Sequence, residues 1–482
     1  MSKLARRCAV LLVAALFAMG CSGSSEGESG AAPTEPDSIP MSTPDLETEE
    51  PATEEPAIGD QGVEPSQAED VPSETPEPIG EEQVSVEETA APIVLTAIDT
   101  GVTAETIKIA ATFPDLSVLG RDNGDLEAKF QVAVDAVNQS GGINGRQIDL
   151  IFSTYVPMGE ADAEALCVRN VEDEGVFAVV GILLREMPLC YTEFNDTIVI
   201  NAFESTAELF ERSVAPLIST NPLPERLVEV NVDTLVDSGH LAPGMRIAVH
   251  GMATREDLHN RYLQALDSRG VEVVAHTLRT TFDVLAAESE VDIFAERWLA
   301  NGAEAVLGSS PESGLDFVGA YERRGIDLPM LLPENTHVVP SLIRDSFGYS
   351  LAPLELAVVL VRDVDPASLY PENIAGVADC LDRFESASGE VVNIDQADDG
   401  PDNLVPTLLA CQVIDVFAAV ARAAGPELTT ESFAAAAESF GPIEVTGLVA
   451  GSLGAGKFDI SDAPAMVGFF DPEALVFTAG GS

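Results

Sequence analysis

From residue 101 onward, the pattern of apolar and polar positions alternates between a period typical of strands and a period typical of helices. The first unit shows both periods. Residues 107–111 form a short β-branched run, and residues 147–152 alternate between polar and apolar. Between them, apolar residues recur at helical spacing over 126–137, and Gly141 and Gly142 end the helix because glycine tolerates a left-handed cap. The pattern predicts a strand–helix–strand unit.

The same alternation continues to residue 332 in two successive sets. The first set predicts helices at 160–174 and 187–194 and strands at 176–181 and 197–201. The second predicts strands at 246–250, 271–275, 303–308 and 329–332 and helices at 225–238, 257–269, 289–300 and 312–324. Such alternation implies mostly parallel sheets with helices on both faces, and two sets suggest two lobes. The last third predicts strands at 354–361 and 467–470 and helices at 374–387, 404–424 and 430–440.

The loop that follows the first strand is the first candidate for a ligand contact. In open α/β sheets, ligands bind in the crevice beyond the carboxyl ends of the strands. We therefore expect residues 112–123 to face a ligand, with Pro114, Asp115 and Ser117 as first contacts.

The N-terminus has the composition of a targeting segment. Three basic residues precede the apolar run 9–19, which is too short to span a bilayer as a mature helix. Residues 18–21 (AMGC) resemble a bacterial lipobox, although Ala18 stands where a larger aliphatic residue is usual. We predict a signal peptide at 1–20 and lipidation of Cys21; the alternative is ordinary secretion with a chance cysteine at the cut.

Residues 21–100 differ from the rest of the chain in composition. They are rich in Pro, Glu, Ser and Thr, and residues 22–100 hold 21 acidic residues and no Lys or Arg. Such a segment cannot bury enough apolar surface to offset its ordering entropy, so we expect a disordered, charge-extended tether.

The whole chain is acidic, with a formal net charge of −57. After residue 100, 60 acidic residues oppose 21 basic ones, which leaves −39. Nucleic acid is therefore excluded as an expected partner because its phosphates would be repelled. Solubility through self-repulsion and adaptation to a saline habitat both account for such a surface.

Four cysteines remain in the predicted exported domain, where oxidation is expected. Four cysteines allow three pairings. We favour the pairs nearest in sequence, Cys167 with Cys190 and Cys380 with Cys411; free buried cysteines are the alternative. No cysteines have CxxC spacing and the five histidines are scattered, so we expect no metal site.

Catalytic motifs are missing from the sequence. There is no GxSxG, HExxH or Walker sequence, and no GxGxxG opens a helix, so we expect neither an enzyme nor a cofactor. The acidic stretch 398–402 could hold a cation, but a solvated loop is the simpler interpretation. His250, at the end of a predicted strand, is a candidate cleft residue or a structural histidine.

Five segments carry a resemblance to a known family: TIKIAATFPDLS from residue 106, AVDAVNQSGGINGR, VFAVVG, LPMLLPEN and GSLGAGKFDI. From residue 101 to about 476 the chain resembles the type I periplasmic binding proteins, above all the substrate-binding proteins of branched-chain or hydrophobic amino-acid ABC transporters. The resemblance implies an α/β fold of two lobes, each a mostly parallel sheet flanked by helices, joined by a three-segment hinge.

The resemblance also implies a division of the chain between the lobes. The first lobe would comprise 101–221 and 334–445, and the second 222–333 and 446–482, with hinge crossings near 220–224, 333–340 and 445–452. Two lobes would close on a small ligand, and the closed form would dock on an ABC permease. We expect a monomer outside the cytoplasm, held at the cell membrane by its lipid alone.

Site residues follow from the family's pattern, position by position. Glu334 lies where the family has the acidic partner of a ligand ammonium. In the loop after residue 181, Leu184 and Arg185 replace the usual hydroxyl-bearing residue; Arg185 could clamp a carboxylate or simply be a surface arginine. The remaining candidates are Asn201, Phe203, Glu204 and Ser205 in the next strand-end loop, where Phe203 is pocket wall or core, and Ser309 and Ser310 after residue 308.

Two other functional classes remain open at this stage. The same clamp could be a ligand-sensing lipoprotein that signals to a receptor without transport, which a neighbouring permease and ATPase gene pair would argue against. A purely structural surface lipoprotein is the remaining alternative.

Overall fold

The computed structural model describes residues 97–119, 123–157, 160–281, 284–310, 313–334, 340, 343–344, 348–362, 376–392, 403–462, 464–472 and 475–479. The predicted signal peptide, Cys21, almost all of the acidic tether and the acidic stretch 398–402 lie outside these residues. Among the described helices, α12 (Leu404–Ala423) is long and apolar enough to cross a membrane, but 78% of its apolar window is buried in the fold.

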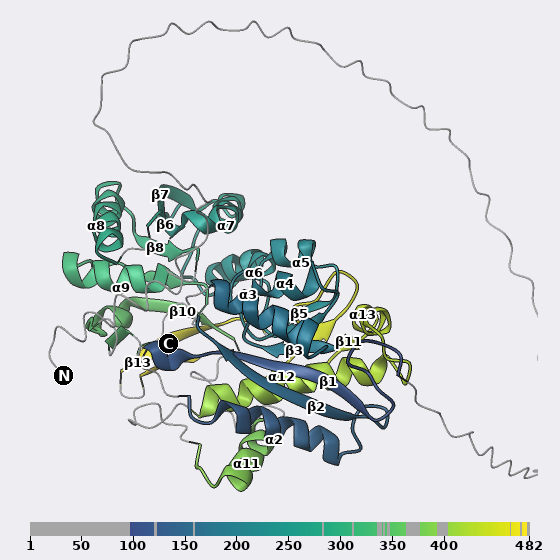
Figure 1. Ribbon diagram of the computed structural model, residues 1–482. Coiled ribbons are helices and arrows are strands. Elements are labelled where there is room, and N and C mark those ends of the chain that lie inside the picture. Colours follow the sequence, from purple (N-terminus) through teal and green to yellow (C-terminus); the bar gives the residue numbers. More distant parts are fainter. Residues whose placement is uncertain are drawn as a thin grey trace, which may run out of the picture. The chain divides into compact units, whose positions relative to one another are not determined.

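The first lobe is built on a parallel sheet of five strands in the order β2-β1-β3-β4-β5 (Figure 1). Its strands are β1 (Thr106–Pro114), β2 (Gln147–Tyr155), β3 (Ala178–Gly181), β4 (Ile198–Asn201) and β5 (Leu217–Ser219). The flanking helices are α2 (Leu126–Gln139), α3 (Glu160–Val168), α4 (Met187–Thr192), α5 (Ala207–Arg212), α11 (Val377–Ser388), α12 and α13 (Thr430–Glu438). The strand–helix–strand unit and its alternating continuation are therefore confirmed.

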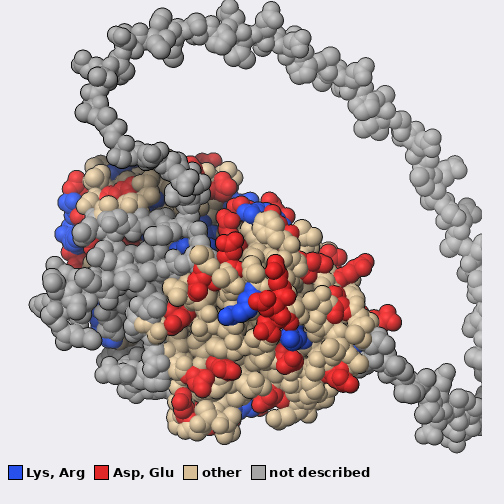
Figure 2. Space-filling view, viewed as in Figure 1, with Lys and Arg blue, Asp and Glu red and all other residues tan. Residues whose placement is uncertain are grey.

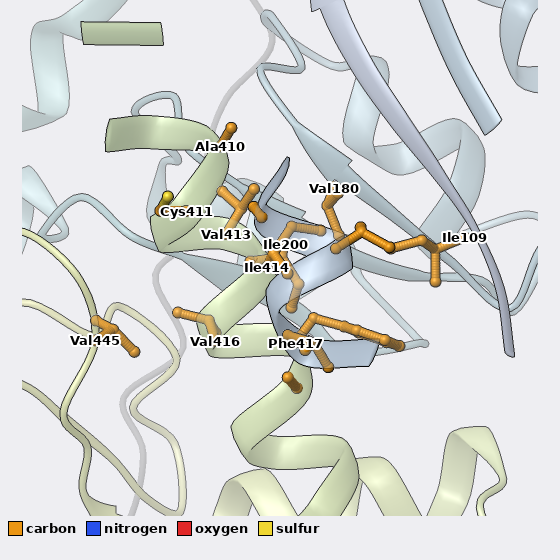
Figure 3. Packing of buried hydrophobic residues seen from close by; sticks show 14 of the residues in the cluster. Ile109, Val180, Ile200, Ala410, Cys411, Val413, Ile414, Val416, Phe417 and Val445 are labelled. Carbon is orange, nitrogen blue, oxygen red and sulfur yellow. The ribbon is translucent and has the colours of Figure 1, made fainter. Parts of the chain in front are cut away.

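Both faces of this sheet are buried, which explains why β3 (AVVG) and β4 (IVIN) are apolar at every position except Asn201. On one face, Ile109, Val180 and Ile200 from three adjacent strands lie against Ile414 and Phe417 of α12 (Figure 3). Ala110, Val179 and Val199 face the other way, into a second cluster that includes residues of α3, α4 and α5. A helix apolar on all sides, such as α12, needs cover from several elements, and α2, α11, α13, β3 and β4 provide it.

The second lobe is built on a seven-stranded sheet in the order β14-β13-β10-β9-β8-β6-β7. Its strands are β6 (Arg246–Met252), β7 (Glu272–Arg279), β8 (Ala305–Gly308), β9 (Met330–Leu332), β10 (Ala357–Val361), β13 (Met466–Asp471) and β14 (Val476–Ala479). Its helices are α6 (Pro224–Asp237), α7 (Glu256–Ser268), α8 (Val284–Ala300) and α9 (Ser313–Arg324). Alternate residues of β6 point to opposite faces: Ile247 and Val249 pack with residues of α6 and α7, and Ala248 packs with residues of α8 and α9.

The structure corrects two of the predicted hinge crossings. The first lies at 220–224 as expected, between β5 and α6. The second comes later than 333–340, because β10 pairs in parallel with β9 and so keeps 357–361 in the second sheet. The third comes later than 445–452, because Leu453 and Ile460 pack in the first lobe's core and the chain joins the second sheet only at β13.

The first and third crossings are bonded to each other. The amide of Ser219 donates to the carbonyl of Phe458 (2.9 Å), and the amide of Ile460 donates back to Ser219 (2.9 Å). Arg226 forms an ion pair with Asp459 at 2.5 Å, and the buried Asp459 carboxylate also accepts from the amide of Leu223. The hinge is therefore a fixed junction at this point, not two independent linkers.

Two disulfides join neighbouring helices of the first lobe. Cys167 of α3 bonds Cys190 of α4, and Cys380 of α11 bonds Cys411 of α12, so the favoured pairing is confirmed. Cross-links of this kind restrict the unfolded chain more than the folded one.

Candidate ligand-binding site

Asn201, the last residue of β4, organises the strand ends of the first lobe. Its buried side chain accepts hydrogen bonds from the amides of Leu183 (3.0 Å) and Phe203 (3.2 Å). Its Nδ2 donates to the carbonyl of Leu183 (3.2 Å) and to Ser205 Oγ (3.3 Å). Asn201 and Ser205 thus fix the two neighbouring loops, and their polar groups are used within the chain.

The loop after β3 is held from a second side by Tyr155, the last residue of β2. The Tyr155 hydroxyl accepts from the amide of Leu184 and donates to the carbonyl of Ile182, each at 3.2 Å. Burial raises the pKa of Tyr155, so its hydroxyl stays protonated. Arg185 follows with a positive φ of 54°, which a non-glycine residue seldom adopts, and its charge acts on Tyr155. Leu184 and Arg185 therefore lie at a strand end, as predicted.

The predicted ligand-facing loop 112–123 begins later than expected. Thr112, Phe113 and Pro114 are buried residues of β1, which runs to the end of its pairing with β2. Asp115 and Ser117 come directly after the strand and bond each other, because Asp115 Oδ1 accepts from the Ser117 amide (3.0 Å) and from its hydroxyl (2.5 Å).

A buried polar cluster occupies the strand ends of the second lobe. Arg362, directly after β10, donates from Nε to Glu334 Oε1 (3.2 Å), and its Nη2 donates to the side chain of Asn231. Asn231 Nδ2 in turn donates to the Tyr262 hydroxyl (3.0 Å). Burial raises the pKa of Glu334, and the neighbouring Arg362 opposes that shift. About a fifth of the Glu334 side chain stays exposed.

One ion pair connects this region across the lobes. Glu204, in the loop after β4 of the first lobe, bonds Arg255, in the turn after β6 of the second lobe, at 2.5 Å. The charge of Glu204 also acts on Glu334 and on Tyr262. The structure thus brings Glu204 and Glu334, two predicted site residues, into one neighbourhood.

Arg255, Arg362, Asn231 and Tyr262 were missed by the sequence analysis. Arg362 had a usable signal, because a charged residue directly follows the fully apolar run 357–361. The others lie on helices or in a turn, where a polar residue is ordinary.

His250 does not end its strand, and the prediction of a cleft-facing position is wrong. β6 continues to Met252, and the His250 side chain is fully buried. Its Nδ1 lies 3.0 Å from Thr277 Oγ1 and its Nε2 lies 3.0 Å from Asp316, which also accepts from Arg279. The structural alternative therefore describes this residue.

Ser309 and Ser310 follow β8, as predicted, but both are buried and bonded inside the second lobe. Ser309 Oγ donates to the carbonyl of His250 (3.1 Å) and lies 2.7 Å from His259 Nδ1. Ser310 Oγ lies 3.3 Å from Ser313 Oγ. Phe203 is partly buried beside Asn201. Within the described residues, no group of three His, Cys, Asp or Glu is arranged to hold a metal ion.

Acidic residues predominate over basic ones on the visible face of the molecule (Figure 2). Arg255 and Arg362 contrast with this, since each is paired with a carboxylate. The strand-end region therefore carries charges of both signs.

Two lobes, each a mostly parallel sheet flanked by helices, match the type I periplasmic-binding-protein fold. The chain belongs to the periplasmic binding protein family, whose model, described as "Periplasmic binding protein", matches residues 106–465. The resemblance seen in the sequence is confirmed. Members of this family are solute-binding proteins of ABC transporters that act outside the cytoplasm, and they are not enzymes.

Individual relatives are distant. A "Leu/Ile/Val-binding protein homolog 8" from Brucella abortus (strain 2308) is 28% identical over 145 residues, 29% of this chain and 34% of the relative. The match thus spans about a third of that protein.

Solved structures resemble the chain over more of its length. An ABC transporter substrate-binding protein from Desulfitobacterium hafniense in complex with Leu has a TM-score of 0.56 at 14% identity, covering 77% of this chain and all of that one. A solute-binding protein from Rhodopseudomonas palustris HaA2 in complex with p-hydroxybenzoic acid gives 0.58 at 13% identity, covering 78% and 96%. At such identities the likeness supports the fold alone.

The buried His259 predicts a pH dependence of folding stability. Burial, and then the nearby His276 and His250, lower the pKa of His259 to about 4. The unfolded state, with a pKa near 6.5, therefore binds more protons between these values, and stability falls as the pH drops from about 6.5 to 4. We expect this single group to account for a loss of about 3 kcal/mol. Urea unfolding from pH 7 to 4 measures it.

His259→Gln removes the titration and should flatten this part of the profile. His276→Gln, at an exposed histidine of β7, is the control and should keep most of the slope. An unchanged slope in His259→Gln would contradict the assignment.

Proposed function

We propose that the chain is an extracytoplasmic, lipid-anchored solute-binding protein that captures a small ligand by lobe closure and delivers it to an ABC importer. The observation that carries the proposal is the meeting of charged residues from both lobes, Glu204 of the first lobe with Arg255, and close to them Glu334 and Arg362 of the second lobe. Ligands of doubly wound sheets bind at this edge. A crevice lined by both lobes couples ligand binding to closure.

The proposed ligand is an amino acid or a related small metabolite. Arg185 is the proposed carboxylate clamp, because guanidinium groups hold carboxylates with two parallel hydrogen bonds. Glu334 is the proposed acceptor for an ammonium group. Pro114, Asp115, Ser117, Leu184 and Phe203 are proposed to border the ligand at the first lobe. Two structural relatives, one in complex with Leu and the other with p-hydroxybenzoic acid, support small carboxylates as the class to test.

Direct binding measurements test the proposal. Calorimetry and thermal shift of the full-length chain should detect at least one ligand among amino acids, amides, short peptides and organic acids. Binding to the folded state raises the unfolding temperature in proportion to the logarithm of ligand concentration. Native mass spectrometry of freshly purified protein should show a co-purified ligand. No ligand in any of these assays would overturn the transport function.

Replacing Glu334 tests its role. Glu334→Gln should weaken an amine-bearing ligand about 10- to 100-fold, because a charged hydrogen bond is lost. The deaminated analogue of the same ligand should lose much less affinity, and calorimetry compares the two.

Because the substitution also leaves Arg362 without its carboxylate, it should lower stability. The double variant Glu334→Gln, Arg362→Met removes the pair as a unit and separates these effects. Equal losses for both ligands would exclude Glu334 as the ammonium acceptor.

The lipid anchor rests on Cys21 alone. In Cys21→Ser, lipid cannot be attached, and the protein should move from the membrane pellet to the soluble fraction when cells are fractionated. Cys8→Ser, within the predicted signal peptide, is the control and should leave the protein in the pellet. Membrane retention of Cys21→Ser would show that the anchor is not this cysteine.

A further inference from the structure

The ion pair between Glu204 and Arg255 differs from the other ion pairs in the described parts of the chain. Apart from the Arg226 contacts at the hinge, it is the pair that joins one lobe to the other. Its residues are 51 positions apart, and their side chains are 22% and 23% exposed. We refer to it as the interlobe ion pair.

Glu204 is carried by a rigid loop. The amide of Phe203, next to it, donates to Asn201, and Ser205 on its other side accepts from Asn201. Asn221 Nδ2 also donates to the carbonyl of Ala202 (2.9 Å). Because the loop is fixed on both sides, little backbone entropy remains to be lost when Glu204 bonds a partner.

Arg255 occupies a position that local structure does not explain. It is the N-cap residue of α7, yet its side chain makes no capping bond. A cation at a helix N-terminus is unfavourable because the helix dipole is positive there, and Ser, Thr, Asp and Asn are the preferred caps. The ion pair with Glu204 in the other lobe offsets the cost of a positive charge at this position.

We infer that the interlobe ion pair holds the two lobes together in the absence of ligand and so supplies part of the free energy of closure. This inference rests on the proposed function by lobe closure and gives Glu204 a role other than ligand contact. Apparent ligand affinity scales with the fraction of molecules that are already in the binding-competent, closed state. An ion pair that raises this fraction therefore raises the apparent affinity.

The size of the effect follows from the geometry. Exposed ion pairs contribute little, because solvent screens them and two flexible side chains must be ordered. Here the side chains of Glu204 and Arg255 are about four-fifths buried. The loop that carries Glu204 is also held in place by hydrogen bonds. We expect breaking the pair to change the closed-to-open ratio about two- to fivefold.

Hydrogen exchange of the full-length chain without ligand tests the inference. In Arg255→Gln, a second-lobe substitution, amides of the first-lobe loop 202–205 should exchange about two- to fivefold faster. Added salt should produce part of the same change in the wild-type chain, because the pair is only partly shielded. The charge-reversed pair Glu204→Arg, Arg255→Glu should restore slow exchange.

Arg212→Gln is the matched control, since Arg212 pairs with Glu193 and Glu208 within the first lobe. It should leave exchange at 202–205 unchanged. Unaltered exchange at 202–205 in Arg255→Gln, or no recovery in the charge-reversed variant with an unchanged unfolding temperature, would overturn the inference. The assay uses no ligand, so its result is separate from the ligand screen that tests the function itself.

Ligands found in that screen give an independent readout. A closure role predicts that Arg255→Gln weakens every ligand by one common factor, as does Glu204→Gln. A loss that depends on the chemistry of the ligand would instead make Glu204 a ligand contact and overturn the assignment.

Discussion

The need to cover a parallel sheet on both faces determines most of this structure. Each sheet is sandwiched between helices, so its apolar faces are unavailable for binding and polar groups gather at the strand ends. At that edge, backbone groups no longer satisfied by a neighbouring strand need partners. Asn201 meets this demand in the first lobe, whereas the Arg362, Glu334 and Asn231 side chains at the strand ends of the second lobe bond one another. In both lobes, polar side chains therefore gather where the strands end.

The sequence predicted best those elements that are long enough for the spacing of apolar residues to repeat several times. The first strand–helix–strand unit and α12 are long, and their apolar spacing distinguishes strand from helix. α5 has six residues and β5 has three, too few for a period to be recognised. β14 was missed for the same reason, and because it extends the edge of the sheet as an antiparallel strand.

The spacing of apolar residues identifies a strand, but it does not show which other strand pairs with it. The apolar run around 357–361 was recognised as a strand, but nothing in its residues states that β9 is its neighbour. Its assignment to the wrong lobe followed from that, as did the misplaced crossing. Likewise, Glu204 was a candidate because it follows a strand, whereas Arg255, 51 residues away, has a meaning only once the fold brings the two together. Single residues could be predicted, but contacts between distant residues could not.

The acidic surface of the chain and the buried Arg362–Glu334 pair differ in how strongly salt screens their electrostatic interactions. At physiological salt, charges on the exposed surface are screened beyond about 8 Å, so the net charge of −57 exerts little force on the strand-end cluster of Arg362 and Glu334. Arg362 and Glu334 are largely buried, and screening weakens their interactions much less. A buried charge that lost its partner would cost several kcal/mol, so the arginine and its carboxylate depend on each other. If Glu334 binds the ligand as proposed, the ligand meets an already neutralised cluster, and selectivity would depend on how it changes these existing pairs.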